Sequence, residues 1–307
     1  MQYTWAQENG VDSANLDEIR LAQIDKFKPD VVYDHSPFVS QGFGTQLRQH
    51  FGVIAVAWNA FIKKDLPEFN SAYHGYVSLH RPFVEEWIRS GYRAAELQPS
   101  PDPSWREFAS RNWDERRNDL MTYGQAGGVF NGRRDMLRRV ADVTLQEDFS
   151  FRAFVGNSKQ YHRPGGRLAR YGMHIPFLLK WPKGALRDCT SNNLYGYELY
   201  DEIRNTKAVL NTFGDFNGTF LSNMRIFEAI GNGAILISQK GQYPDGLQEG
   251  NDFFAYEDER DVAQIMRFVK DEPIAARDFA ASAKKRLHKN FRKENQYEKF
   301  RDFVATL

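Results

Sequence analysis

The chain has 307 residues with 41 basic and 40 acidic side chains, and its formal net charge at pH 7 is +1. This balance argues against a general binder of nucleic acids or other polyanions. A single cysteine, Cys189, excludes an internal disulfide framework and a zinc site built from cysteines. No run reaches the roughly 20 apolar residues of a membrane span, and residues 1–21 are too polar for a signal peptide. We therefore expect a soluble, cytoplasmic protein without a membrane span.

The first half of the sequence alternates short apolar runs with helical patterns, which predicts a parallel, Rossmann-like sheet. We expect strands at residues 31–34, 53–57 and 75–79, and helices at residues 16–27, 41–50 and 82–90. A cluster of prolines at residues 99–103, followed by charged residues, places a domain boundary near residue 115. Only one helix precedes the first convincing strand, so this domain is either abbreviated or belongs to a longer chain or assembly.

The second half restarts the same alternation of strands and helices. We expect strands at residues 120–123, 151–155, 208–210 and 234–237, and helices from about residue 133, at 198–204, at 260–270 and from residue 275. The predicted fold class is therefore α/β, with two Rossmann-like domains that face a central cleft. These domains comprise residues 1–115 and 116–290, and a C-terminal helix over residues 291–307 packs back on the first domain.

The most informative stretch spans residues 222–238, where a capped helix, a glycine-rich stop and a buried strand follow one another. Ser222 or Asn223 can cap the helix, because a side-chain oxygen can accept from unpaired backbone N–H groups. Glu228 projects roughly opposite the apolar face of this helix. A helix start beside the carboxyl ends of parallel strands suits an anion, so Glu228 lies where a phosphorylated ligand could bind. The alternative is an ordinary solvated glutamate.

The region from residue 195 to residue 256 resembles glycosyltransferases of the GT-B fold. The resemblance is closest to the CgeB-like group, which is described as glycosyl transferases group 1 and is related to retaining enzymes. Weaker similarity extends through both domains and includes residues 28–32. The segments that carry the likeness are residues 196–200 (GYELY), 207–211 (KAVLN), 223–229 (NMRIFEA) and 249–253 (EGNDF).

The resemblance implies that the second domain binds a nucleotide-diphosphate sugar, linked to UDP or GDP, and needs no other cofactor. Glu228 matches the glutamate that holds the ribose hydroxyls, and its two oxygens suit two vicinal hydroxyls. Backbone N–H groups of Ser222, Asn223 and Met224 would face the diphosphate. Retaining relatives often carry a second glutamate earlier in this motif, but that position is Phe220 here. The residues expected near the nucleotide base are Tyr195, Gly196 and Tyr197.

A second constellation combines a glycine-rich loop with basic residues. Glycines let a backbone approach a phosphate closely, and guanidinium groups can neutralise a leaving diphosphate. The loop residues expected to bind the donor are Gly124, Gly127 and Gly128, and the expected catalytic arginines are Arg133 and Arg134. Plain loop chemistry is the alternative. Arg225 could assist or form an ion pair with a neighbouring carboxylate, and Asn211 could line the site or satisfy local backbone groups.

Polar residues that follow strands of the first domain form the expected acceptor side. They are His35, Trp58, Asn59 and His80, of which His80 could orient a hydroxyl or act as a base. Their alternative role is that of ordinary polar residues at loop starts. A basic stretch at residues 159–170 could attract an anion or could be a solvated loop. The histidines lack any metal-binding spacing, so we predict no metal.

The sequence thus predicts a glycosyltransferase that moves a sugar from a nucleotide-diphosphate sugar to an unknown acceptor, which could be a glycan, a lipid-linked molecule or a protein. Arg133, Arg134 and helix N-terminal amides would stabilise the leaving diphosphate, and transfer would retain the anomeric configuration. One alternative is a non-catalytic nucleotide-binding or scaffolding module of a larger glycosyltransferase. A weaker alternative is a sugar-nucleotide epimerase or a phosphorylase of the same fold.

Overall fold

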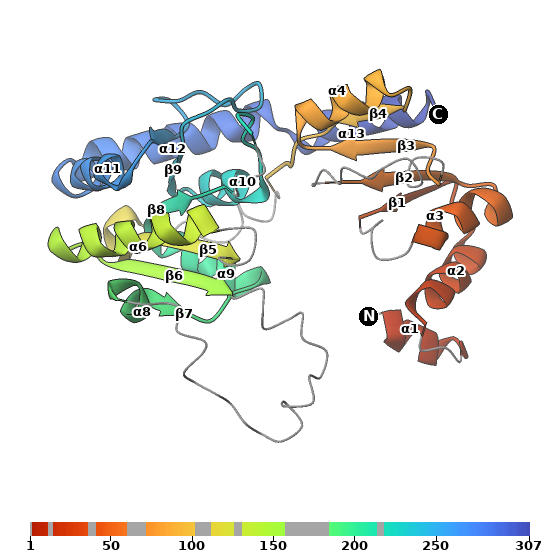
Figure 1. Ribbon diagram of the computed structural model, residues 1–307, viewed down its shortest axis with the longest axis horizontal. Helices are drawn as coiled ribbons and strands as arrows, with labels where there is room; N and C mark the ends of the chain where they lie inside the picture. Colours follow the sequence, from red (N-terminus) through yellow and green to blue (C-terminus); the bar gives the residue numbers. More distant parts are fainter. Residues whose placement is uncertain are drawn as a thin grey trace. The chain divides into compact units, whose positions relative to one another are not determined.

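A computed structural model describes residues 2–11, 15–35, 41–59, 72–101, 112–125, 131–156, 184–213 and 218–307. The chain forms two compact units. Unit 1 comprises residues 1–99 and 294–307, and unit 2 comprises residues 100–293. Each unit contains one parallel sheet flanked by helices (Figure 1).

Unit 1 is built on four parallel strands in the order β1-β2-β3-β4. The strands are β1 (Val31–Asp34), β2 (Ile54–Trp58), β3 (Gly75–Ser78) and β4 (Ala94–Glu96). The helices are α1 (Gln2–Glu8), α2 (Leu16–Phe27), α3 (Gln41–Gln46), a π-helical segment η1 (Leu47–Phe51), α4 (Arg81–Arg89) and α13 (Lys293–Val304). Buried aromatic side chains such as Tyr76 and Trp87 fill the core between the sheet and these helices.

The C-terminal helix α13 belongs to unit 1 although it comes last in the chain. The Phe300 ring meets Tyr33 of β1 edge-on, with the ring centroids 5.4 Å apart. The backbone N–H of Gln98 donates to Oε1 of Gln296 at 3.1 Å. A Cβ atom on Gly75 would lie 2.7 Å from the Phe303 ring, so only glycine lets β3 and the end of the chain approach so closely.

The two units divide between Pro99 and Ser100, earlier in the chain than the predicted boundary near residue 115. Two contacts explain the difference. The Ser100 hydroxyl donates to the carbonyl of Phe291 at 2.7 Å, and Trp113 lies in a core cluster of unit 2. The proline-rich stretch therefore already begins unit 2.

Unit 2 contains six parallel strands in the order β10-β9-β8-β5-β6-β7. They are β5 (Asn118–Gln125), β6 (Phe151–Gly156), β7 (Thr190–Ser191), β8 (Thr206–Asn211), β9 (Ile235–Gln239) and β10 (Phe254–Tyr256). The chain proceeds from β5 to β6 and β7 on one side, and then crosses back to place β8, β9 and β10 on the other. The strand order therefore reverses between β5 and β8, and ligands of open α/β sheets bind at the carboxyl ends of strands at such a point.

The helices of unit 2 follow from amphipathic patterns. They are a 3-10 turn η2 (Trp113–Glu115), α6 (Asn131–Gln146), α8 (Ala185–Cys189), α9 (Gly196–Arg204), α10 (Met224–Gly231), α11 (Glu259–Asp271) and α12 (Pro273–Asn290). As predicted, Ile226, Phe227 and Ile230 form the buried face of α10. Gly233 has the left-handed φ of +77° expected after a helix, whereas Gly231 is still helical.

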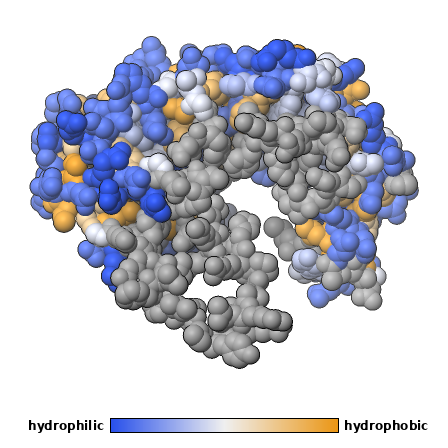
Figure 2. All heavy atoms as spheres, viewed as in Figure 1, coloured by the Kyte–Doolittle hydropathy of each residue, from blue (hydrophilic) through white to orange (hydrophobic). Residues whose placement is uncertain are grey.

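Three short strands, β4, β7 and β10, were not predicted, because none has an apolar run long enough to indicate a strand. The predicted long C-terminal helix is in fact two helices, α12 and α13, separated at Phe291 and Arg292. The break allows Phe291 to pack edge-on against Phe227 at 5.0 Å. The outer surface over α11 and α12 is mostly hydrophilic (Figure 2). No helix among the described residues is long and apolar enough to cross a membrane.

Candidate functional site

The site of unit 2 begins at the N-terminus of α10, which lies beside the reversal point between β5 and β8. Asn223 has extended backbone angles, and its Oδ1 accepts from the N–H of Ile226 at 3.3 Å. The first-turn N–H groups of a helix have no acceptor within the helix and carry a partial positive charge. The cap therefore presents the N–H groups of Met224 and Arg225 to a negatively charged group.

Asn211, the last residue of β8, is fully buried and connects the surrounding elements. Its Oδ1 accepts from Nδ2 of Asn223 at 2.9 Å and from Nη1 of Arg225 at 3.0 Å. Its Nδ2 donates to the Ser238 hydroxyl at 3.1 Å, and its carbonyl accepts from the Tyr256 hydroxyl at 3.3 Å. Asn211 therefore holds the helix cap and the Arg225 guanidinium in place.

Two guanidinium groups, those of Arg133 and Arg225, converge on Gly124 at the end of β5. A Cβ atom on Gly124 would lie 3.0 Å from Nη2 of Arg225 and 3.4 Å from Nη1 of Arg133. Arg133 is only 2% exposed, and its Nη2 donates to the carbonyl of Tyr123 at 2.6 Å. Within the described residues, Nε of Arg133 has no hydrogen-bond partner.

Within the described residues, no pair of carboxylates forms ion pairs with these two cations. Burial lowers the pKa of Arg133 well below its usual value, and the charge of Arg225 lowers it further. Burial also lowers the pKa of Arg225, while Tyr123 and Glu228 oppose that shift. Neither arginine forms an ion pair within the part of the chain that the structure describes. Buried like charges are costly unless something neutralises them, so the site suits a polyanion such as a diphosphate.

Changing Asn211 to aspartate tests the charge of this site. In Asn211→Asp the new carboxylate keeps the shape of the side chain and lies against Arg225. We expect it to neutralise that guanidinium and to lower the affinity for inorganic pyrophosphate about tenfold, as for the loss of one charge-assisted hydrogen bond. Calorimetric titration of both proteins with pyrophosphate measures the effect. Equal affinities would mean that Arg225 does not bind phosphate.

Glu228 is partly buried near Arg225 and is not a solvated surface residue. Its Oε2 accepts from the hydroxyl of Tyr123 at 2.7 Å. Burial raises the pKa of Glu228, whereas the Tyr123 hydrogen bond and the Arg225 charge lower it, and the net shift is upward. The Arg225 guanidinium also lies 5.9 Å from the centroid of the Tyr123 ring. The Glu228 carboxylate therefore lies within the electrostatic reach of Arg225 and is held by Tyr123.

The predicted nucleotide residues meet at this edge of the sheet. Gly124, Arg133, Asn211, Ser222, Asn223, Arg225 and Glu228 lie on β5, β8 or α10, at the start of α6, or in the short segment before α10. Met224 is 46% exposed in the first turn of α10. Arg134 is next to Arg133 on α6 and half-buried, and the helical turn of about 100° directs its side chain elsewhere. Gly127, Gly128 and the basic stretch at residues 159–170 fall outside the described residues.

The predicted base-contacting residues open α9. Tyr195 caps this helix without a side-chain hydrogen bond to it, and Gly196 has a left-handed φ of +55°. The rings of Tyr195 and Tyr197 are 68% and 74% exposed. Because the C-terminus of α9 leads directly into β8, its N-terminus lies toward the carboxyl edge of the sheet. Their contact with a base remains a prediction.

Three further residues belong to this site without having been predicted from the sequence: Tyr123, Ser238 and Tyr256. Tyr123 touches all three charged groups: its carbonyl contacts Arg133, its ring lies near Arg225 and its hydroxyl reaches Glu228. Its position directly before Gly124 at the end of a buried strand was the available signal, because strand ends at the carboxyl edge point into ligand sites.

In unit 1, the predicted acceptor residues lie at or just after the carboxyl ends of β1, β2 and β3. His35 and Trp58 stack with their ring centroids 4.2 Å apart and an interplanar angle of 7°. The backbone N–H of Asn59 donates to the carbonyl of Val77 at 2.9 Å. His80 precedes α4, is 5% exposed, and burial lowers its pKa to about 4. His80 is therefore a neutral imidazole at pH 7.

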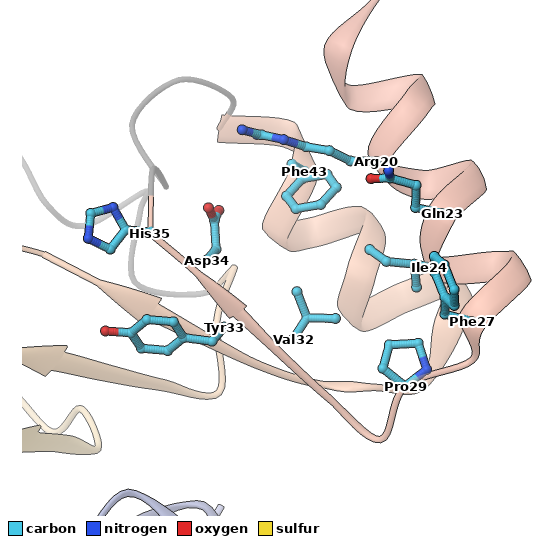
Figure 3. A pocket seen from close by; sticks show the side chains of 10 residues that line it. All are labelled: Arg20, Gln23, Ile24, Phe27, Pro29, Val32, Tyr33, Asp34, His35 and Phe43. Carbon is cyan, nitrogen blue, oxygen red and sulfur yellow. The ribbon is translucent and has the colours of Figure 1, made fainter. Parts of the chain in front are cut away.

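A cavity of about 460 Å³ lies beside β1, and His35 lines it (Figure 3). Ile24, Phe43 and Val32 form apolar walls between α2, α3 and β1. Arg20 extends over the Phe43 ring at 5.5 Å, and the Asp34 carboxylate lies on the same side of β1 as Val32. The cavity thus combines apolar walls with polar groups near the carboxyl end of β1. Within the described residues, no group of His, Cys, Asp and Glu side chains could hold a metal ion.

The sequence model of a family described as glycosyl transferase-like matches residues 129–302, more than half of the chain. The chain belongs to this glycosyltransferase family. Among curated protein sequences, none matches the chain significantly. The matched segment covers α6, α10 and most of unit 2, including Arg133, Arg225 and Glu228.

Solved glycosyltransferase structures show the same fold. A TarM variant from S. aureus, in complex with UDP and other ligands, superposes with a TM-score of 0.62 at 9% identity, over 94% of this chain and 59% of TarM. HepE from Anabaena with UDP and glucose gives 0.61 at 12% identity, over 94% of this chain and 81% of HepE. The α,α-trehalose-phosphate synthase (UDP-forming) from Burkholderia vietnamiensis superposes with a TM-score of 0.60 at 12% identity, over 95% of this chain and 76% of the synthase. The fold is therefore the two-domain GT-B type.

Proposed function

We propose that the protein is a glycosyltransferase that uses a nucleotide-diphosphate sugar as donor, with the nucleotide bound in unit 2. The observation that carries the proposal is the convergence of two guanidiniums on Gly124, that of the buried Arg133 and that of the partly buried Arg225, with the partly buried Glu228 carboxylate near Arg225. A diphosphate would supply the negative charge that neutralises the Arg133 and Arg225 guanidiniums. A ribose supplies hydroxyl donors for Glu228. Similar proteins of the same fold were solved with UDP, which supports UDP as the first nucleotide to test.

The reaction would break the bond between the anomeric carbon and the diphosphate, and its electron pair would leave on the phosphate oxygen. Arg133, Arg225 and the N-terminal amides of α10 would stabilise that charge, and they need little reorganisation because hydrogen bonds and packing already hold them. The acceptor hydroxyl would form the new bond and pass its proton to the departing diphosphate. We further propose retention of the anomeric configuration, which proton NMR of the transfer product would establish.

We propose that the acceptor binds at the carboxyl edge of the unit 1 sheet. The stacked rings of His35 and Trp58 offer a flat apolar surface, and sugar rings pack well on such surfaces. Asn59 and His80 lie at the ends of neighbouring strands and bring polar groups to the same edge. The apolar walls of the adjoining cavity would suit an acceptor that is not a sugar alone.

The first test measures nucleotide binding by Glu228→Ala. We expect at least one of UDP, GDP, ADP, CMP and dTDP to raise the melting temperature of the wild-type protein, because a ligand that binds only the native state stabilises it. The variant should bind that nucleotide ten- to hundredfold more weakly, since it lacks one charge-assisted contact. Glu147→Ala, which changes a glutamate next to the far end of α6, is the control and should bind normally.

The second arm of the test separates an enzyme from a binding module. Hydrolysis of UDP-glucose and GDP-mannose is measured with and without candidate acceptors. Binding of a nucleotide with neither hydrolysis nor transfer would favour a non-catalytic module. Absence of binding for every nucleotide, with the protein folded, would contradict the proposed function itself.

A further inference from the structure

Tyr123 connects the three charged side chains of the site, although no sequence motif marks it. It lies on β5, is 6% exposed and is separated by 105 positions from Glu228. Its hydroxyl donates to Oε2 of Glu228 at 2.7 Å. A carboxylate on a flexible side chain has a broad range of terminal torsion angles, and a buried donor restricts that range.

The hydrogen bond uses one acceptor site of Oε2 and fixes the plane of the carboxylate, and the remaining acceptor sites can take up both vicinal hydroxyls of a ribose. An ionised carboxylate only accepts hydrogen bonds, so its natural partners are hydroxyl groups such as those of a ribose. A nucleotide without the 2′-hydroxyl offers one donor fewer. A fixed carboxylate therefore favours ribose over 2′-deoxyribose, because a buried acceptor that loses its hydroxyl partner costs binding free energy.

We propose that Tyr123 is a positioning residue that orients the Glu228 carboxylate and sets a preference for ribose over 2′-deoxyribose nucleotides. The inference rests on the proposed function, since it assumes that a nucleoside diphosphate binds in unit 2. Tyr123 acts through Glu228 and does not itself contact the reacting atoms.

The same contact extends the pH range over which the nucleotide binds. The described groups that face Glu228 or Tyr123 are Arg225 on α10 and Tyr200 on α9, and Arg133 of α6 meets the Tyr123 carbonyl. None of these is a histidine or a carboxylate, so Glu228 is the only acidic side chain of this cluster. Burial raises its pKa and the Tyr123 hydroxyl opposes that rise. Affinity that needs the ionised carboxylate is full above this pKa and is lost below it.

The test compares UDP and GDP with their 2′-deoxy analogues in the full chain, by calorimetry at several pH values between 5 and 8. In Tyr123→Phe we expect the affinity for the ribonucleotide to fall about tenfold, while the affinity for the 2′-deoxy analogue changes less than twofold. The ratio of the affinity for the ribonucleotide to the affinity for its 2′-deoxy analogue should therefore approach one. The pH at which ribonucleotide affinity is half lost should rise, because the removed hydroxyl no longer lowers the pKa of Glu228.

Tyr73→Phe is a matched control from unit 1. The Tyr73 hydroxyl also donates to a carboxylate, that of Asp34, at 2.5 Å, so the variant removes the same kind of contact far along the chain from the site. It should leave the ribose preference and the pH midpoint unchanged. Glu228→Gln is the second variant: it keeps an acceptor for the tyrosine but should remove the pH dependence that Glu228 causes.

The outcomes are distinct. An unchanged ratio and midpoint in Tyr123→Phe, or an equal loss for both nucleotides, would overturn the positioning role and leave the proposed function intact. If the wild-type protein binds the ribonucleotide and its 2′-deoxy analogue equally, the ribose preference does not exist. If it binds neither, the proposed function fails as well.

Discussion

Replacing Arg133 with methionine should abolish most of the affinity for a nucleoside diphosphate while leaving the unliganded protein as stable as before, or more stable. Methionine matches the apolar part of the arginine and fits a buried position. The variant removes one of two guanidiniums that converge on Gly124, and with it their mutual repulsion and the burial of a charge. Replacing a buried charge by an apolar side chain is often neutral or stabilising.

The loss of affinity should be about ten- to 150-fold, which corresponds to about 1.5–3 kcal/mol for a hydrogen bond to a charged group. Thermal unfolding of the variant with and without saturating nucleotide measures both effects at once. We expect an unchanged or higher melting temperature without ligand, and a much smaller rise when the ligand is added. Arg138→Met is the control, because that side chain is exposed on the same helix and has no expected role in the site. A large drop in melting temperature without ligand would mean that Arg133 is mainly structural.

Adding a methyl group at Gly124 should both destabilise unit 2 and block the phosphate site. Gly124 has φ of +113°, where residues with a Cβ atom are strained, and such strain costs about 1–3 kcal/mol. In addition, the new Cβ would lie 3.0 Å from Nη2 of Arg225. Asn211 accepts a hydrogen bond from the same guanidinium, so we expect that its displacement by the new Cβ would break this contact and weaken phosphate binding.

Gly250→Ala separates the effect of backbone strain from the effect of the close contact with Arg225. Gly250 also has a positive φ, +77°, but a Cβ atom there meets nothing within 4 Å. We expect both variants to lose stability in denaturant unfolding, and only Gly124→Ala to lose pyrophosphate and nucleotide affinity, by at least tenfold. Normal affinity in a folded Gly124→Ala protein would place the phosphates elsewhere.

The elements that the sequence predicted are those whose own residues determine their conformation. The run Ala234-Ile235-Leu236-Ile237 is apolar throughout and forms the buried strand β9, and the pattern around Glu228 forms α10 as expected. By contrast, β7 consists of Thr190 and Ser191 only. Such a pair becomes a strand because β6 offers it hydrogen bonds, which no local pattern can reveal.

The same distinction applies to the site. The start of α10 was predictable because a cap and a helix stop are local signals. The contact of Tyr123 with Glu228 joins residues that are 105 positions apart, and it follows from the strand order that places β5 next to β8. The charge of the site depends on the burial of Arg133, which the surface-like composition of its helix does not indicate. The roles of all the predicted site residues, on the nucleotide side and on the acceptor side, stay predictions.

The return of α13 to unit 1 has a consequence for biosynthesis. Unit 2 is one uninterrupted segment, whereas unit 1 needs residues 294–307, which are synthesised after all of unit 2. Domains generally fold as units while the chain is being made. The β3 surface around Gly75 therefore stays uncovered until Phe303 arrives, so unit 2 can complete its fold before unit 1, in the reverse of their order in the gene.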